Sequence, residues 1–181
     1  PTRRSSDLNL LALMAMGGVC YLGQSFCYFA ALQHATAGLT ALLLYLYPAI
    51  VTVLSALMAR RRLSLLRILA VAAALLGTGL AVGGSLAGSP IGILLGVGAA
   101  LIYSVYILVG ERVTPAAGAI PSATVIMLSA ALGYGLIVLW RGPAFPTSPA
   151  AWAAVGGIVV LSTVVAMITF FAGMARLGAA D

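Results

Sequence analysis

Charged residues are scarce in this chain of 181 residues, at 7% of the total. A soluble globular protein carries roughly a quarter, and no soluble core could bury a chain that is 63% apolar with a mean hydropathy of +1.18. Acids are the scarcest charges, because Glu111 is the single carboxylate between Asp7 and Asp181. The composition therefore predicts an integral membrane protein, and these residues give no support to a proton relay between carboxylates at membrane depth.

Groups that could do chemistry are equally few. The chain has one histidine, His34, and two cysteines, whereas an intramembrane enzyme needs a nucleophile and base or clustered metal ligands at membrane depth. We therefore expect no enzymatic activity, no metal and no cofactor. Cys20 and Cys27 lie about 10.5 Å apart along a helix axis, too far for a disulfide, and are interpreted as packing residues. Glu111 beside Arg112 indicates an interfacial ion pair.

What the chain does have is a series of long apolar runs. Each reaches or approaches the roughly 20 residues that a helix needs to cross the hydrocarbon layer. The runs are Leu10 to Leu32, Ala37 to Ala59, Ile68 to Leu86, Ile91 to Gly110, Ser122 to Trp140 and Ala150 to Met174. The sequence thus predicts an all-α integral membrane protein with six transmembrane helices, whose partner is the lipid bilayer.

The arginines predict the orientation of these helices. Arg60, Arg61, Arg62 and Arg67 lie in one short link, which the positive-inside rule places in the cytoplasm. Alternation then puts the turns at 33–36, 84–90 and 141–150 outside, and puts 111–121 and the tail after 176 inside. Because most cations lie between or at the ends of spans, the net charge of +6 reports orientation, and we expect no nucleic-acid partner.

Two segments read as copies of one sequence, 142 positions apart. They are Tyr28 to Leu39 (YFAALQHATAGL) and Phe170 to Asp181 (FFAGMARLGAAD), and three of their twelve positions are identical. The first ends a span that runs outward and the second a span that runs inward, which indicates an inverted repeat. The intact protein is then expected to have about 280 residues and ten helices in two inverted five-helix repeats. Here 9–88 would hold the last three helices of repeat one, and 89–181 the first three of repeat two.

The first eight residues, PTRRSSDL, are expected to be foreign to the fold. They match one reading frame of a common sequencing-library adapter, CCTACACGACGCTCTTCCGATCT. We therefore interpret 1–8 as an adapter scar and exclude it from the predicted bundle.

The second and third runs carry a recognisable order of residues: AGLTALLLYLYPAIVTVLSAL, then MARRRLS, then LLRILAVAAALLGTGLAV. This order resembles the drug/metabolite transporter superfamily, in particular its EamA-type domain, with Pro48, Leu63, Ser64 and Gly77 at matching places. Arg61 departs from the resemblance, because it stands where the family link carries an acid. The resemblance implies helices arranged around a central substrate cavity.

Polar and aromatic residues within the spans are the candidate site. On the first span, one helix face carries Tyr21, Gln24, Ser25 and Tyr28. Gln24 could equally form a hydrogen bond to a neighbouring helix and serve packing alone. Pro48 predicts a kink in the second span. The kink would either allow the helix to pack or act as a hinge. The predicted substrate-binding residues are Tyr21, Gln24, Tyr28, Tyr45, Thr52, Tyr103, Tyr106, Thr163 and Thr169. The Gly79/Gly83 and Gly92/Gly96 pairs are interpreted as helix-packing motifs, and His34 as a solvated turn residue.

These observations predict a secondary transporter that moves a small organic metabolite, amino-acid-like or drug-like, across the bacterial cytoplasmic membrane by alternating access. The alternative is a structural or assembly membrane protein without transport activity. A homodimer is left open by the sequence, as are the substrate, the direction of transport and the coupling ion.

Overall fold

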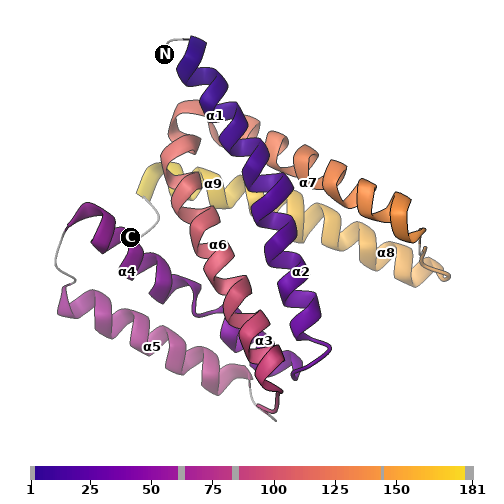
Figure 1. Ribbon diagram of the computed structural model, residues 1–181, viewed down its shortest axis with the longest axis horizontal. Coiled ribbons are helices and arrows are strands. Elements are labelled where there is room, and N and C mark those ends of the chain that lie inside the picture. The colour runs from indigo at the N-terminus through magenta and orange to yellow at the C-terminus, as the bar shows by residue number, and fades with distance from the viewer. Residues whose placement is uncertain (1–2, 61–63, 83–85, 144, 178–181) are drawn as a thin grey trace. The chain divides into compact units, whose positions relative to one another are not determined.

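The computed structural model of the chain describes residues 3–60, 64–82, 86–143 and 145–177, and these residues are almost wholly helical (Figure 1). The described part contains no strand, only an isolated antiparallel bridge between Ala35 and Gly88. The predicted all-α class is confirmed. Arg61, Arg62, Leu63 and Gly83, which carry predictions from the sequence, lie outside the described residues.

The helices follow one another with short links (Figure 1). In chain order they are α1 (Arg3–Ala15), the π-helix η1 (Met16–Tyr21), α2 (Leu22–Ala31), α3 (Ala37–Leu44), α4 (Tyr47–Ala59), α5 (Leu65–Val82), α6 (Pro90–Ala117), α7 (Ala119–Arg141), α8 (Pro149–Gly157), the π-helix η2 (Ile158–Val165) and α9 (Ala166–Leu177).

Among the described residues, five helical stretches are long and apolar enough to cross a membrane. They are Asp7–Ala31, Ala37–Ala59, Pro90–Ala117, Ala119–Arg141 and Pro149–Gly173. The third predicted span, from Ile68, corresponds to α5, whose apolar stretch Leu65–Leu80 is shorter than the others. The chain is therefore a multi-pass helical membrane protein, and α5 as a sixth span stays a prediction.

Side-chain caps begin several of these helices. A serine or threonine hydroxyl accepts a hydrogen bond from the main-chain N–H three residues later, which satisfies one of the donors left unpaired at a helix start. The capping residues are Thr36 for α3, Ser64 for α5, Ser89 for α6 and Ser148 for α8. Proline follows directly at positions 90 and 149, where its missing N–H costs nothing.

The second span is interrupted rather than simply kinked. Helix α3 ends at Leu44, Tyr45 and Leu46 form a turn, and Pro48 lies in the first turn of α4. The N–H of Tyr45 donates to the carbonyl of Ala41 at 2.9 Å and that of Leu46 to Leu43 at 3.2 Å, so the turn tightens before the new helix begins. A hinge at Pro48 stays a prediction. The helix is nevertheless interrupted at this place, as a hinge would require.

The chain forms two compact units. One is Cys20–Leu108, and the other consists of the stretches before Cys20 and after Leu108. In Cys20–Leu108, α5 packs against α3 and α4, and α2 packs against α3. The turn at 33–36 is joined to the residues before α6, because Thr36 N–H donates to the carbonyl of Ala87 and Ser89 N–H to that of His34.

Glycines of α6 allow close packing within this unit. A Cβ on Gly92 would lie 2.9 Å from the main-chain carbonyl of His34, and one on Gly96 would lie 2.7 Å from Cδ1 of Leu43. The Gly92/Gly96 pair is therefore a packing motif, as predicted. Gly79 makes only ordinary contact distance, 3.9 Å, with Leu42.

In the other unit, α7 packs against α1 and α9. The closest approach is at Gly17, where a Cβ would clash with the main-chain carbonyl of Ile126 and would lie 2.9 Å from the Cβ of Ser129. Only glycine fits at this point. Leu13, Met16, Ala123, Ile126 and Phe171 are buried here.

The two spans that carry the sequence repeat share two structural features. Both contain a π-helix, and η2 begins 142 residues after η1 (158 − 16 = 142). Both also contain an edge-to-face aromatic pair at the same offset: Tyr28 with Phe29 at 5.7 Å and 80°, and Phe170 with Phe171 at 5.4 Å and 71°. The backbone and the aromatic packing thus follow the register seen in the sequence.

Candidate functional site

Five tyrosines form a cluster inside the Cys20–Leu108 unit. Ring centroids of Tyr45 and Tyr47 lie 6.4 Å apart, Tyr47 meets Tyr103 edge to face at 4.9 Å, and Tyr103 stacks on Tyr106 at 5.7 Å. Tyr21 lies near both Tyr103 and Tyr106. We call Tyr21, Tyr45, Tyr47, Tyr103 and Tyr106 the tyrosine cluster. It joins the first, second and fourth predicted spans.

The break in the second span positions this cluster. In a continuous helix Tyr45 and Tyr47 would point about 160° apart, but the turn at 45–46 brings their rings together. Helix α6 is fixed beside the break by Ser104, which is fully buried. Its hydroxyl donates to the carbonyl of Ala100 at 2.7 Å and lies 3.4 Å from that of Tyr47.

The cluster runs from the core of the unit to its surface. Tyr106 is 2% exposed, whereas Tyr45 is 49% exposed. Hydroxyl groups within a largely apolar bundle can both donate and accept hydrogen bonds, and the ring faces offer stacking surfaces. Such groups can contact the polar, aromatic or aliphatic parts of a small molecule.

Of the polar and aromatic face predicted on the first span, only one residue joins the tyrosine cluster. Tyr21 joins the tyrosine cluster, while the ring of Tyr28 contacts Phe29 edge to face. Gln24 lies between them in α2 and is half-buried. The roles of Gln24 and Tyr28 in binding stay predictions.

The three predicted threonines bond to their own helices. Thr52 donates to the carbonyl of Pro48 at 2.7 Å, Thr163 to that of Ile158 at 3.2 Å, and Thr169 to that of Val165 at 2.8 Å. Each oxygen keeps lone pairs that can accept further bonds. Thr52 belongs to the unit with the tyrosine cluster, whereas Thr163 and Thr169 belong to the other unit.

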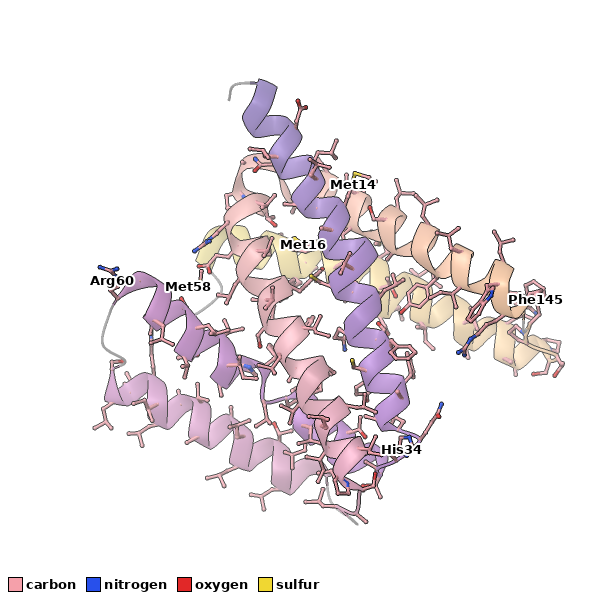
Figure 2. All side chains as sticks on the ribbon, in the orientation of Figure 1. Met14, Met16, His34, Met58, Arg60 and Phe145 are labelled. Atoms are coloured by element: carbon pink, nitrogen blue, oxygen red, sulfur yellow. The ribbon has the colours of Figure 1, made fainter. Side chains whose placement is uncertain are left out.

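Charged residues are few in the stretch that forms the cluster. No Asp, Glu or Lys occurs from Cys20 to Leu108, and the four arginines of this stretch fall at 60, 61, 62 and 67. Figure 2 shows Arg60 and His34 at opposite ends of the unit, with exposed side chains. Among the described residues, no three His, Cys, Asp or Glu side chains gather in a group suited to a metal ion.

Two residues of the site were not predicted from the sequence, Tyr47 and Ser104. Tyr47 was missed because regular helical spacing was used to group residues on both sides of the expected kink, and that spacing placed Tyr47 away from Tyr45. The signal was available in the Tyr-Leu-Tyr-Pro string, since a helix often starts with proline in its first turn, so Pro48 could mark the beginning of a new helix.

The comparison with family models decides the classification. The model of the EamA-like transporter family matches residues 1–83 and 90–181. The chain belongs to the EamA-like transporter family. The family membership that Pro48, Ser64 and Gly77 indicated is thereby confirmed. The chain is a membrane protein of the drug/metabolite transporter superfamily. Among curated proteins, none matches this family member significantly.

A solved structure shares the fold of this EamA-like chain. It is described only as a crystal structure of a protein, and it matches with a TM-score of 0.75 at 26% sequence identity. The match covers 92% of this chain and 58% of the solved chain. The chain thus spans little more than half the length of the protein that it matches.

Proposed function

We propose that this EamA-like chain is part of a secondary transporter that moves a small organic metabolite across the bacterial cytoplasmic membrane by alternating access. Family membership is the observation that carries the proposal. The substrate would be amino-acid-like or drug-like, because the tyrosine cluster offers hydroxyl groups and aromatic rings.

We further infer that the transporter is built from two inverted five-helix repeats, six of whose ten helices lie in this chain. Three observations support this. The family model matches in two stretches that meet between 83 and 90. The π-helices begin 142 residues apart, and the edge-to-face aromatic pairs have the same offset. Repeats of this kind place their substrate near the bilayer midplane.

The substrate would contact the tyrosine cluster together with Gln24, Tyr28 and Thr52. Thr163 and Thr169 of the other unit stay predicted substrate-binding residues. Pro48 would let α4 move relative to α3, since the interrupted backbone at Tyr45 and Leu46 can change its angles without breaking a regular helix. No step of this mechanism requires an enzyme nucleophile, in keeping with a family of transporters.

The test is uptake by proteoliposomes that contain the full-length protein. A panel of labelled amino acids and small aromatic drugs would be offered, with empty liposomes as the control. Saturable uptake of a panel compound that falls when Tyr103 is replaced by Ala, at unchanged protein content, is the expected result. If no compound of the panel is taken up by wild-type protein that is folded in the liposomes, the alternative of a structural or assembly protein is favoured.

A further inference from the structure

The two π-helices occupy equivalent places in the two copies of the repeat. In η1 and η2 the backbone leaves regular α-helical bonding at residues 16 and 158, at the repeat offset of 142. π-Helices are rare, and they are frequent at functional sites. A rare backbone form at the same register in two sequences that share few residues indicates a common role for it. The residues themselves, MGGVCY and IVVLSTVV, have no identical position in that register.

The first π-helix also lies where the two compact units meet along the chain. Within the described residues the chain passes between the units at two points, Val19–Cys20 in η1 and Leu108–Val109 in α6. One of these two points therefore lies within η1, in the first span.

Glycines near the π-helices are not explained by close packing. A Cβ added at Gly18 would have no neighbouring atom nearer than the Ser129 carbonyl oxygen, at 3.9 Å, and no described atom lies within 4 Å of one added at Gly156 or Gly157. Glycine within a helix costs roughly 1 kcal/mol relative to alanine because it gains the most freedom on unfolding. Gly17 differs, because Ile126 requires it. The other three glycines lower the local stability of η1 and of the turn before η2.

The last helical turn of η2 shows how the wide backbone is held. The hydroxyl of Thr163 donates to the carbonyl of Ile158, five residues earlier, at 3.2 Å. In regular α-helices, threonine hydroxyls of this chain reach back four residues instead, as Thr52 and Thr124 do. The side chain of Thr163 therefore supplements the backbone bonding of the π-helix.

We propose that η1 and η2 are paired flexible joints, in which the backbone exchanges between π- and α-helical hydrogen bonding. The helical segments on either side of each joint then move as rigid pieces. A role for these joints in alternating access rests on the proposed transport function, whereas their flexibility does not. The exchange is local, because a π-turn differs from an α-turn by one residue in each hydrogen-bonded ring.

The test is hydrogen exchange of the full-length protein in lipid nanodiscs. Amides of η1 and η2 are compared with those of α2 and α9, which continue the same spans. We expect the π-helical amides to exchange at least about tenfold faster, since local opening needs less free energy there. Equal exchange rates in η1 and α2 would overturn the proposal.

Two variants test the π-helical geometry itself. Deleting Val19 removes the extra residue of the wide turn, so the span can close as a continuous α-helix with its flanking faces nearly in register. Gly18→Ala stiffens η1 without a steric clash, and it remains informative if the deletion prevents folding. Gly98→Ala is the matched control, because Gly98 lies in the α-helical part of α6 with no described atom within 4 Å.

The expected result is slower exchange in η1 for the deletion and for Gly18→Ala, and unchanged exchange for Gly98→Ala. Initial uptake of a panel compound should fall in the first two variants alone. Slowed exchange with normal uptake would overturn the role of the joint in transport. If wild-type protein takes up no compound, the proposed function fails, while the exchange rates still decide whether η1 and η2 are joints.

Discussion

The main-chain N–H of Ser89 donates a 2.8 Å hydrogen bond to the carbonyl oxygen of His34. Together with the bond from Thr36 N–H to Ala87, it joins the α2–α3 turn to the start of α6. These two turns were expected on the same side of the membrane, and they meet at one end of the Cys20–Leu108 unit. Arg60 lies at the other end (Figure 2). The helices between the His34 turn and Arg60 can therefore cross the membrane with these two residues on opposite sides.

The first prediction concerns orientation. Arginine excess places the α4–α5 link in the cytoplasm, so a cysteine introduced at Arg60 should be protected from an impermeant thiol reagent in intact cells. A cysteine introduced at Gln33 should be labelled. Both positions are exposed, and Cys20 and Cys27 are replaced by Ala in the background. Labelling at position 60 with none at position 33 would reverse the topology.

The second prediction concerns the packing of α6. Gly92→Ala should destabilise the protein by about 1–3 kcal/mol, because its new methyl group would press on the main chain of His34. Gly98→Ala, in the same helix with no described atom within 4 Å, should be neutral or slightly stabilising. Thermal unfolding in detergent measures both. Equal effects of the two substitutions would show that the close approach at Gly92 is absent in solution.

The third prediction compares two neighbouring glycines of η1. Gly17→Ala should lower the yield of folded protein, since a Cβ there overlaps the main chain of Ile126. Gly18→Ala should leave the yield near that of the wild type, because a Cβ there stays 3.9 Å from its nearest neighbour. Size-exclusion chromatography after membrane extraction measures the folded fraction. A normal yield for Gly17→Ala would contradict the α1–α7 packing.

Most helices could be located from the sequence because the bilayer imposes a length and an apolar composition on each span. The prediction for Ala37–Ala59 agrees with the outer limits of α3 and α4. The prediction that stopped at Gly110 was too short, since α6 continues to Ala117. An apolar run ends at its first charged residue. The helix itself can continue past Glu111 and Arg112 into the interfacial region of the membrane.

Departures from regular helix were not predictable from hydropathy. The π-helices at 16–21 and 158–165 are largely apolar, like the helices on either side of them. Hydropathy therefore does not show where an α-helix becomes a π-helix. The gathering of Tyr21, Tyr45 and Tyr103 was partly foreseen from their helix faces. The inclusion of Tyr47 depends on the turn at 45–46, which a helical wheel does not contain.

The fourth prediction concerns buried hydroxyls. Ser122 is fully buried, and its hydroxyl has no hydrogen-bond partner among the described residues. Ser122→Ala should therefore stabilise the protein by about 1 kcal/mol, because a buried hydroxyl without a partner loses its hydration uncompensated. Ser104→Ala should destabilise by a similar amount, since its hydroxyl bonds to Ala100. Melting temperatures in one detergent compare the two, and a lower value for Ser122→Ala would indicate an unseen partner.

The fifth prediction decides between packing and binding for Gln24. Hydrogen bonds between membrane helices average only about 0.6 kcal/mol, so replacing a packing Gln24 by Leu should barely affect the bundle. Replacing a substrate contact acts differently. A polar substrate group left unpaired costs roughly 1–3 kcal/mol, or about 5-fold to 150-fold in affinity.

We therefore expect Gln24→Leu in the full-length protein to raise the substrate concentration for half-maximal uptake by at least about fivefold, at nearly normal membrane abundance. Gln33→Leu is the control, because it makes the same chemical change in an exposed turn. Initial uptake rates against substrate concentration, with abundance measured in parallel, separate affinity from expression. An unchanged affinity and rate for Gln24→Leu would assign Gln24 to packing, and the predicted binding surface of the first span would then reduce to Tyr21 and Tyr28.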